Sequence, residues 1–210
     1  MRPGKYQVAG SEAECEPGSG NLVLRNLRGI THPEGIDEAE SVELVRTTVQ
    51  VLEANDAERR FTADDIRYLH KLWLESIYPW AGEYRSVNMS KDGFPFASAY
   101  LIPQLMGELE DGPLAKFTPF RFESAEERAE ALAVTHAEII LIHPFREGNG
   151  RCARLFALAM SAQAGFTELD FSPMEDDEAG YIRAIHQAQR GDYAPMQRVF
   201  SEILKRSVAA

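Results

Sequence analysis

The stretch HPFREGNGRCAR, residues 143–154, decides how the rest of the sequence is interpreted. It places one histidine, one glutamate, two glycines and three arginines within twelve positions of a chain whose net charge is -11. The apolar runs on either side, AEIILI before it and LFALAM after it, are typical of buried helices. We therefore expect a loop between two core helices, with Pro144 ending the first helix at His143.

The residue types in this loop suit the binding of a polyphosphate. Gly148 and Gly150 free the backbone to bring N–H groups close to an anion, and the helix that follows points its positive end the same way. Arg151 and Arg154 lie one helical turn apart, so both guanidinium groups can face one polyphosphate. Glu147 could hold a Mg²⁺ ion that bridges phosphate oxygens.

His143 is the candidate general base for a hydroxyl that arrives from outside, because histidine titrates near neutral pH. Taken singly, these features have ordinary structural interpretations: a histidine often caps a helix, an arginine pair is often solvated, and Gly-Asn-Gly is a common turn. Their joint occurrence between two apolar helices favours the transfer of a group from a nucleotide to an alcohol. The residues alone leave the transferred group open.

The composition is that of an ordinary globular chain. Its 210 residues are 44% hydrophobic and 26% charged, which suits one compact domain. No apolar run approaches the roughly 20 residues of a membrane span, so we expect no membrane insertion. The N-terminal stretch MRPGKYQVAGSEAE lacks the apolar run of a secretory signal, and we expect a cytoplasmic protein.

Charge and cysteine content exclude further classes of protein. The 33 acidic residues outnumber the 22 basic ones and would repel a phosphate backbone, so we expect no binding to nucleic acid. The two cysteines, Cys15 and Cys152, have neither the spacing of a metal site nor the density of a disulfide scaffold. We expect both to be reduced thiols.

Hydrophobic spacing predicts a mostly α-helical fold. Residues 1–36, rich in Gly and Pro, are expected to form an irregular segment packed on the core, and residues 37–210 a catalytic domain. Helices are predicted from Asp37 to near Asn55, after Thr62 until Pro79, around 101–109, and over 124–142, 150–164, 175–189 and 192–205. The first of these is expected to turn one apolar face to the core, formed by Ala39, Val42, Val45, Val49 and Leu52.

The segment from Tyr84 to Ser98 interrupts the helical pattern. Two short runs that contain Val or Phe flank a Lys-Asp-Gly turn signal at residues 91–93. This pattern predicts a β-hairpin, which is the one convincing β-element of the sequence.

The stretch at 143–154 resembles the signature of the Fic domain family, H-x-F-x-[D/E]-G-N-G-R-x-x-R, at every defined position. The segments IYPWAGEYR (77–85) and SKDGFPFA (90–97) are similar to the region that leads into the family's hairpin flap and to the flap itself. The segment EPGSGNLVLRNLRGI (16–30) resembles the family's N-terminal region less closely. The resemblance implies a single Fic-type helical bundle with one β-hairpin flap.

The same resemblance implies a protein adenylyltransferase, which moves AMP from ATP to a Tyr, Thr or Ser hydroxyl of a target protein, uses Mg²⁺ and releases pyrophosphate. By this likeness His143 would deprotonate the target hydroxyl, Phe145 would anchor the loop in the core, and Glu147 would hold Mg²⁺. The anion hole for the nucleotide would be formed by Gly148, Asn149 and Gly150. Its β and γ phosphates would be bound by Arg151 and Arg154.

The resemblance also implies a role for the tip of the hairpin. Lys91, Asp92, Gly93 and Phe94 would cover the nucleotide and present a strand edge on which the target aligns. A plain solvent-exposed turn is the structural alternative. Tyr181 could border the adenine in the family arrangement, although an ordinary packed aromatic residue accounts for it equally well.

Two other functions stay open. Some relatives transfer a phosphoryl or phosphocholine group, but the phosphoryl-transferring ones replace the second glycine and the arginine after it, and Gly150 and Arg151 are intact here. A binding module that keeps the nucleotide pocket without transferring anything belongs to a different class, and the complete motif disfavours it.

Control of the activity is predicted from a pattern that is missing. Many members of the family carry an inhibitory helix, [S/T]-x-x-x-E-[G/N], whose glutamate pairs with the second motif arginine, here Arg154. The Glu-Gly pairs at 34–35 and 147–148 have Ile30 and His143 where the pattern needs Ser or Thr. We expect the chain to be active alone or restrained by a small antitoxin-like protein. A diverged inhibitory segment within the first 36 or last 20 residues is the alternative.

Overall fold

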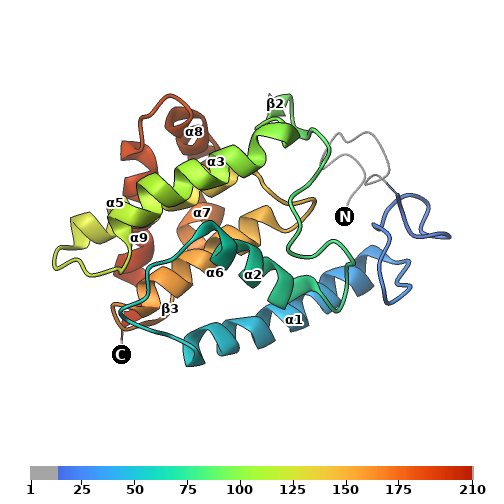
Figure 1. Ribbon diagram of the computed structural model, residues 1–210, viewed down its shortest axis with the longest axis horizontal. Coiled ribbons are helices and arrows are strands. Elements are labelled where there is room, and N and C mark those ends of the chain that lie inside the picture. Colours follow the sequence, from blue (N-terminus) through green and yellow to red (C-terminus); the bar gives the residue numbers. More distant parts are fainter. Residues whose placement is uncertain (1–13, 210) are drawn as a thin grey trace.

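The structure is a computed structural model that describes residues 14–209, and it is mostly helical (Figure 1). Two predictions concern residues 1–13, which lie outside the described residues: the start of the irregular segment and the expectation that the chain has no secretory signal. The helices are α1 (Pro33–Glu53), α2 (Ala63–Leu74), α3 (Ile102–Leu109), α4 (Ala115–Phe117), α5 (Ala125–Ile142), α6 (Asn149–Ala162), α7 (Ser172–Asp176), α8 (Glu178–Ala188) and α9 (Ala194–Arg206). A π-helical turn, Glu110–Leu114, links α3 to α4.

Helix α5 is the centre of the packing. It contacts α6, α8 and α9, while α1 packs against α2 at one edge of the molecule, away from α8 (Figure 1). The large apolar cluster lies around α5 and α6, and a smaller one around Trp73, Ile77, Val23 and Leu24 joins the segment before α1 to the end of α2. Within the described range, no helix has the length and apolarity needed to cross a membrane.

Two predicted helix starts are confirmed by capping boxes. Thr62 precedes α2, and Asp65 accepts a hydrogen bond from the Thr62 N–H at 2.8 Å. Ser124 precedes α5 and accepts from the Glu127 N–H at 3.1 Å. Each box satisfies N–H groups that the first turn of a helix leaves without partners.

Several predicted helix boundaries were wrong. Helix α1 begins at Pro33 instead of Asp37, because proline suits the first turn of a helix, where no N–H is needed. Helix α2 ends at Leu74, before Pro79 is reached. The helix predicted over 175–189 is two helices, since Asp177 leaves the helical conformation and caps α8 by accepting from the Gly180 N–H at 2.8 Å.

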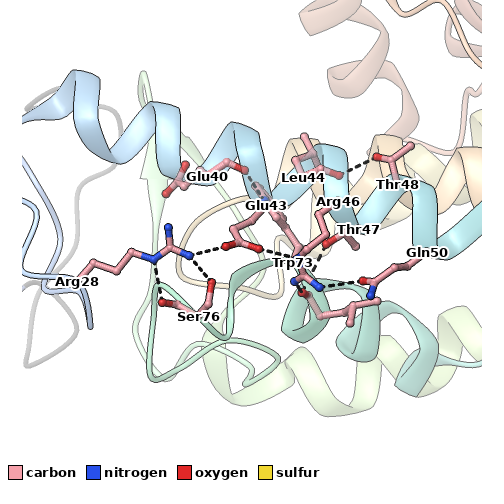
Figure 2. A network of polar contacts seen from close by, with 11 residues as sticks. Arg28, Glu40, Glu43, Leu44, Arg46, Thr47, Thr48, Gln50, Trp73 and Ser76 are labelled. Atoms are coloured by element: carbon pink, nitrogen blue, oxygen red, sulfur yellow. Dashed lines mark hydrogen bonds and ion pairs between the residues drawn. The ribbon is translucent and has the colours of Figure 1, made fainter.

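The apolar face predicted for α1 was right at Ala39 and Leu52, which pack against the core, and wrong at the three valines. Val42, Val45 and Val49 are 61%, 67% and 50% exposed, whereas Glu40 and Thr47 are buried with Ile36 and Ala39. Figure 2 shows a polar network on α1 in which Glu43 pairs with Arg28 and Arg46. Polar contacts therefore hold α1 against the core together with the apolar contacts of Ile36, Ala39 and Leu52.

The predicted hairpin is confirmed. Strands β1 (Ser90–Lys91) and β2 (Phe94–Pro95) pair antiparallel around a turn in which Asp92 and Gly93 have φ of 51° and 80°. Positive φ at both central residues is the backbone of a type I′ turn, which matches the twist of paired strands. A second antiparallel pair, β3 (Phe166–Glu168) with β4 (Val208–Ala209), was not predicted, because such short segments carry no alternating pattern.

Candidate active site

His143 ends α5 in a left-handed conformation. Its φ and ψ are 52° and 59°, and its N–H donates to the carbonyl of Ile139 at 2.9 Å. A left-handed backbone is uncommon for a residue other than glycine. It turns the chain sharply, so the loop that follows runs back to the start of α6.

The imidazole of His143 is held by stacking and by a carbonyl. Its ring lies on the ring of Phe96, with centroids 3.7 Å apart and planes 12° apart. Nδ1 lies 3.3 Å from the carbonyl oxygen of Ile140. This contact favours the tautomer with the proton on Nδ1, and that tautomer carries its lone pair on Nε2.

Arg85 fixes the base of the hairpin to the end of α5, and it is a residue that the sequence analysis missed. Its buried guanidinium donates to the carbonyl of His143 at 2.7 Å, to that of Val87 at 2.5 Å and to that of Ala97 at 2.6 Å. The residue lies inside the segment IYPWAGEYR, but nothing in its spacing distinguishes it from a surface arginine.

His70 binds the loop that follows His143. The N–H of Gly82 donates to Nδ1 of His70 at 2.9 Å, so the proton lies on Nε2 and is donated to the carbonyl of Glu147 at 3.0 Å. The ring also stacks on the buried ring of Phe145, with centroids 3.8 Å apart. Burial lowers the pKa of His70 to about 4, which keeps the ring neutral in this arrangement.

Asn149 closes the loop on itself. Its Oδ1 accepts from the Phe145 N–H at 2.8 Å, and its Nδ2 donates to the Phe145 carbonyl at 2.8 Å. Both ends of the side chain are therefore used in the loop.

The start of α6 presents backbone N–H groups. Gly148 caps the helix with φ of 81°, and Gly150 follows in the first turn. A Cβ placed on Gly150 would meet nothing within 4 Å, so the protein packing does not require glycine at that position. Cys152, one residue into the helix from Arg151, is free and buried, and burial raises the pKa of its thiol to about 12. Cys15, in the segment before α1, forms no disulfide bond with Cys152.

The two motif arginines face the same space from successive turns of α6. Nη2 of Arg151 lies 2.6 Å from Oε2 of Glu40, and Nη1 of Arg154 lies 3.2 Å from Oε1 of Glu175. Each guanidinium also lies over an aromatic ring, that of Trp73 for Arg151 and that of Phe171 for Arg154. Both side chains remain about one third exposed.

A cavity of about 390 Å³ brings the predicted site residues together. It is lined by His143, by the loop and the start of α6, and by the hairpin, through Glu147, Gly148, Asn149, Gly150, Arg151, Arg154, Lys91, Asp92 and Phe94. Gly93 does not line it and serves the turn instead. A smaller cavity of about 200 Å³ beside α1 and α2 contains none of these residues.

Helix α8 forms the wall opposite the motif. Glu178, Tyr181, Ile182, Ile185 and His186 line the cavity, and the ring of His186 stacks on that of Phe94 at 4.6 Å. The hairpin tip thus reaches across to α8. The spacing of these five residues marks one helical face, but the sequence singled out Tyr181 alone, because a partly exposed apolar face looks like any packing face.

The donor set suits a Mg²⁺ ion that arrives with phosphate. Among the residues that the structure describes, no group of three or more His, Cys, Asp or Glu side chains is placed to hold a metal. Glu147, however, offers a buried carboxylate at the cavity wall, with Oε1 3.7 Å from Nη2 of Arg151. Mg²⁺ is commonly bound by one or two carboxylates together with phosphate oxygens and water, so the site fits a magnesium–nucleotide complex.

Comparison with known proteins agrees with this geometry. The Fic/DOC family profile matches residues 60–161. The chain is 31% identical over 182 residues to the "Probable protein adenylyltransferase y4lH" of Sinorhizobium fredii, with 87% of this chain and 90% of the relative covered. It is 26% identical over 190 residues to the "Probable protein adenylyltransferase Fic" of Escherichia coli, covering 88% and 89%.

A solved structure shares the fold. The N-terminal Fic domain of a VirB-translocated effector protein from Bartonella quintana, determined with bound ADP, superposes with a TM-score of 0.71 at 25% identity, over 90% of this chain and 92% of that one. The extent of these matches and the complete motif lead to one conclusion: the chain belongs to the Fic/DOC family.

Proposed function

We propose that this chain is a protein adenylyltransferase, which transfers AMP from ATP to a hydroxyl side chain of a target protein. The observation that carries the proposal is the shared cavity, in which His143 faces the same space as the N-terminus of α6, Arg151 and Arg154. The names of the similar proteins from Sinorhizobium fredii and Escherichia coli support the same activity.

ATP would lie with its phosphates at the start of α6. There the helix dipole and the backbone N–H groups near Gly150 attract an anion, and Arg151 and Arg154 supply charge-assisted hydrogen bonds to the β and γ phosphates. The flat face of the adenine suits the wall formed by α8, where Ile182 and Ile185 lie. A local positive site of this kind lets a chain of net charge -11 hold a polyphosphate.

The reaction is a substitution at the α phosphorus. The oxygen of the target hydroxyl attacks the α phosphorus, its proton passes to Nε2 of His143, and the bond from the α phosphorus to the bridging oxygen breaks. AMP is then joined to the target through a phosphodiester, and pyrophosphate leaves from the side of Arg151 and Arg154. The stacking of His143 on Phe96 holds the base in one orientation during the proton transfer.

Glu147 would hold Mg²⁺ together with phosphate oxygens. When bound, Mg²⁺ neutralises charge that develops on the phosphates. Glu147 is suited to this task because the bond from His70 to its carbonyl fixes its backbone, and its carboxylate lines the cavity.

The target would dock along the hairpin. Lys91, Asp92 and Phe94 line the cavity, and the short strand pair presents backbone groups next to the site of transfer. An extended segment of the target that pairs with this strand edge would bring its hydroxyl toward His143. Such docking depends on hydrogen bonds to the backbone of the target more than on its side chains.

Regulation by a separate protein is a further part of the proposal. In this structure Arg154 is paired with Glu175, whose side chain is 70% exposed, through one contact at 3.2 Å. An exposed pair of this kind is weak and would yield to a triphosphate. A small antitoxin-like partner that supplies an acidic side chain to Arg154 would therefore restrain the enzyme more strongly than the chain does alone.

Labelled ATP tests the proposal. The purified protein is incubated with Mg²⁺, cell lysate and ATP labelled at the α or the γ phosphate. We expect the α label to become covalently attached to protein. Attachment of the γ label would instead show phosphoryl transfer, and tight ATP binding with neither label attached would show a binding module.

A further inference from the structure

Glu40 is a buried carboxylate whose two oxygens are both engaged. The residue is 3% exposed and lies in α1, more than one hundred positions before the motif. Its Oε2 accepts from Nη2 of Arg151 at 2.6 Å, and its Oε1 accepts from the hydroxyl of Tyr78 at 2.6 Å. Its backbone carbonyl accepts from Nε1 of Trp73 at 2.8 Å, the contact drawn between α1 and α2 in Figure 2.

These contacts surround one side of Arg151. The guanidinium lies over the ring of Trp73 at 4.7 Å, and the carboxylate of Glu40 approaches it from α1. Burial acts to lower the pKa of Arg151, but the charge of Glu40 and its hydrogen bond raise it above its ordinary value. Burial and the charge of Glu40 also raise the pKa of Tyr78, so that its hydroxyl stays protonated and keeps donating.

The position of Glu40 argues against a role as an inhibitor of nucleotide binding. Arg151 lines the cavity, whereas Glu40 is buried against Tyr78 and Trp73 and is not among the residues that line it. A carboxylate that blocked a phosphate would have to occupy the cavity itself. Glu40 instead binds Arg151 from outside the cavity, while Arg151 itself lines it.

An ion pair between a buried carboxylate and a guanidinium that is about one third exposed is weak evidence for stability. Removing two charges from water costs about as much as their attraction returns, and such pairs are often replaceable by apolar residues without loss. The pair does impose a direction on the guanidinium, because arginine has a rigid, planar set of donors. Orientation is therefore the property that Glu40 supplies.

We propose that Glu40 is a positioning residue for Arg151, which it holds in the orientation that binds the β phosphate of ATP. The inference rests on the proposed function, since it takes Arg151 as a phosphate ligand. Tyr78 contributes by fixing the second carboxylate oxygen, and Trp73 contributes by fixing both the backbone of Glu40 and the plane against which the guanidinium lies.

The test compares Glu40→Gln with the matched control Glu43→Gln. Glu43 lies one turn further along α1, is also largely buried, and pairs with Arg28 and Arg46 instead of a cavity residue (Figure 2). Calorimetric titration of each variant with ATP, ADP and AMP measures three affinities. Their comparison distinguishes a loss of Arg151 orientation from a general disturbance of the nucleotide site. AMP lacks the β phosphate, so a loss of positioning should not affect its affinity.

We expect Glu40→Gln to weaken ATP and ADP binding about 10-fold, as expected when a hydrogen bond between charged groups is lost, and to leave AMP binding unchanged. Glu43→Gln should leave the affinities for all three nucleotides unchanged. Tyr78→Phe, which removes one of the two bonds on Glu40, should give a smaller loss in the same direction and serves as the test if Glu40→Gln does not fold.

Three results would overturn the inference: a Glu40→Gln variant that binds ATP as Glu43→Gln does, one that binds ATP more tightly than the parent, or one that loses AMP as strongly as ATP. If Glu40→Gln does not fold, a Tyr78→Phe variant that binds ATP with the parent's affinity would also overturn the inference. The readout is binding and not transfer, so it can be distinguished from a failure of the proposed function. A parent protein that binds ATP but attaches no α label would contradict the adenylyltransferase activity and leave the Glu40 inference standing.

Discussion

Gly148 lies against the indole of Trp73 so closely that a Cβ on Gly148 would be 2.7 Å from Cζ3 of that ring. Its φ of 81° is also in the region that side chains disfavour. The first glycine of the motif is thus required by the fold, both by its backbone and by its neighbour. Gly150, two residues on, is under neither constraint.

This difference separates the two glycines experimentally. We expect Gly148→Ala to lower the free energy of unfolding by about 2–4 kcal/mol, from the left-handed backbone and the contact with Trp73. Gly150→Ala should keep the parent's stability but weaken ATP binding about tenfold, because its methyl group enters the space of the phosphates. Gly107→Ala in α3, where a Cβ also meets nothing within 4 Å, is the control: it should leave ATP affinity unchanged and raise stability by up to about 1 kcal/mol, because Ala suits a helix interior better than Gly. A Gly150→Ala variant with parental ATP affinity would contradict the placement of the phosphates.

The second motif arginine should contribute to binding and not to proton transfer. We expect Arg154→Ala to weaken ATP binding about 10- to 100-fold, because charge-assisted hydrogen bonds to phosphate are lost, and to leave AMP binding unchanged. Glu175→Gln, which removes the exposed partner of Arg154, should leave ATP affinity within a factor of about two, since such pairs are weak. Unchanged transfer by Arg154→Ala at low ATP concentration would show that the phosphate assignment is wrong.

Two buried histidines make the stability depend on pH. Burial lowers the pKa of His70 to about 4, and burial with the charge of Arg154 lowers that of His136 to about 3. The unfolded chain therefore binds more protons than the folded one below about pH 6.5, and stability falls as the pH falls through that value. The loss contributed by each residue levels off below its folded-state pKa.

Between pH 7 and pH 5 each histidine should cost about 2 kcal/mol of unfolding free energy, which urea denaturation can measure. In His70→Gln this loss should shrink by about 2 kcal/mol, whereas His32→Gln, at an exposed position, should keep it. Stability at pH 5 that equals or exceeds the stability at pH 7 would contradict neutral, buried histidines.

Local signals made part of the fold predictable. The helix starts at Thr62 and Ser124 and the turn at Asp92 and Gly93 follow from contacts within a few residues, so the sequence contains their whole cause. The motif at 143–154 was recognisable for the same reason, because the glycine that caps α6, the bonds between Asn149 and Phe145 and the two arginines of α6 all lie within twelve positions. Its match to a family signature then named the reaction that its chemistry had left open.

Partners distant in the sequence made the rest unpredictable. The valines of α1 were misleading, because the helix contacts the rest of the chain partly through Glu40 and Glu43, whose partners Arg28 and Arg151 lie elsewhere in the sequence. Arg85 and His70 act on the active-site loop from elements that lie 58 and 77 positions away. Neither residue type nor spacing reveals such a contact before the chain is folded.

The central claim is that His143 takes a proton from a target hydroxyl while ATP is held by other residues. The most direct measurement compares the parent and His143→Ala for attachment of α-labelled AMP to protein, at an ATP concentration that saturates both. We expect the parent to attach the label, and His143→Ala to be slower by about 10²–10⁴-fold while it binds ATP within a few-fold of the parent. Transfer by His143→Ala at one tenth of the parent's rate or faster would contradict the claim.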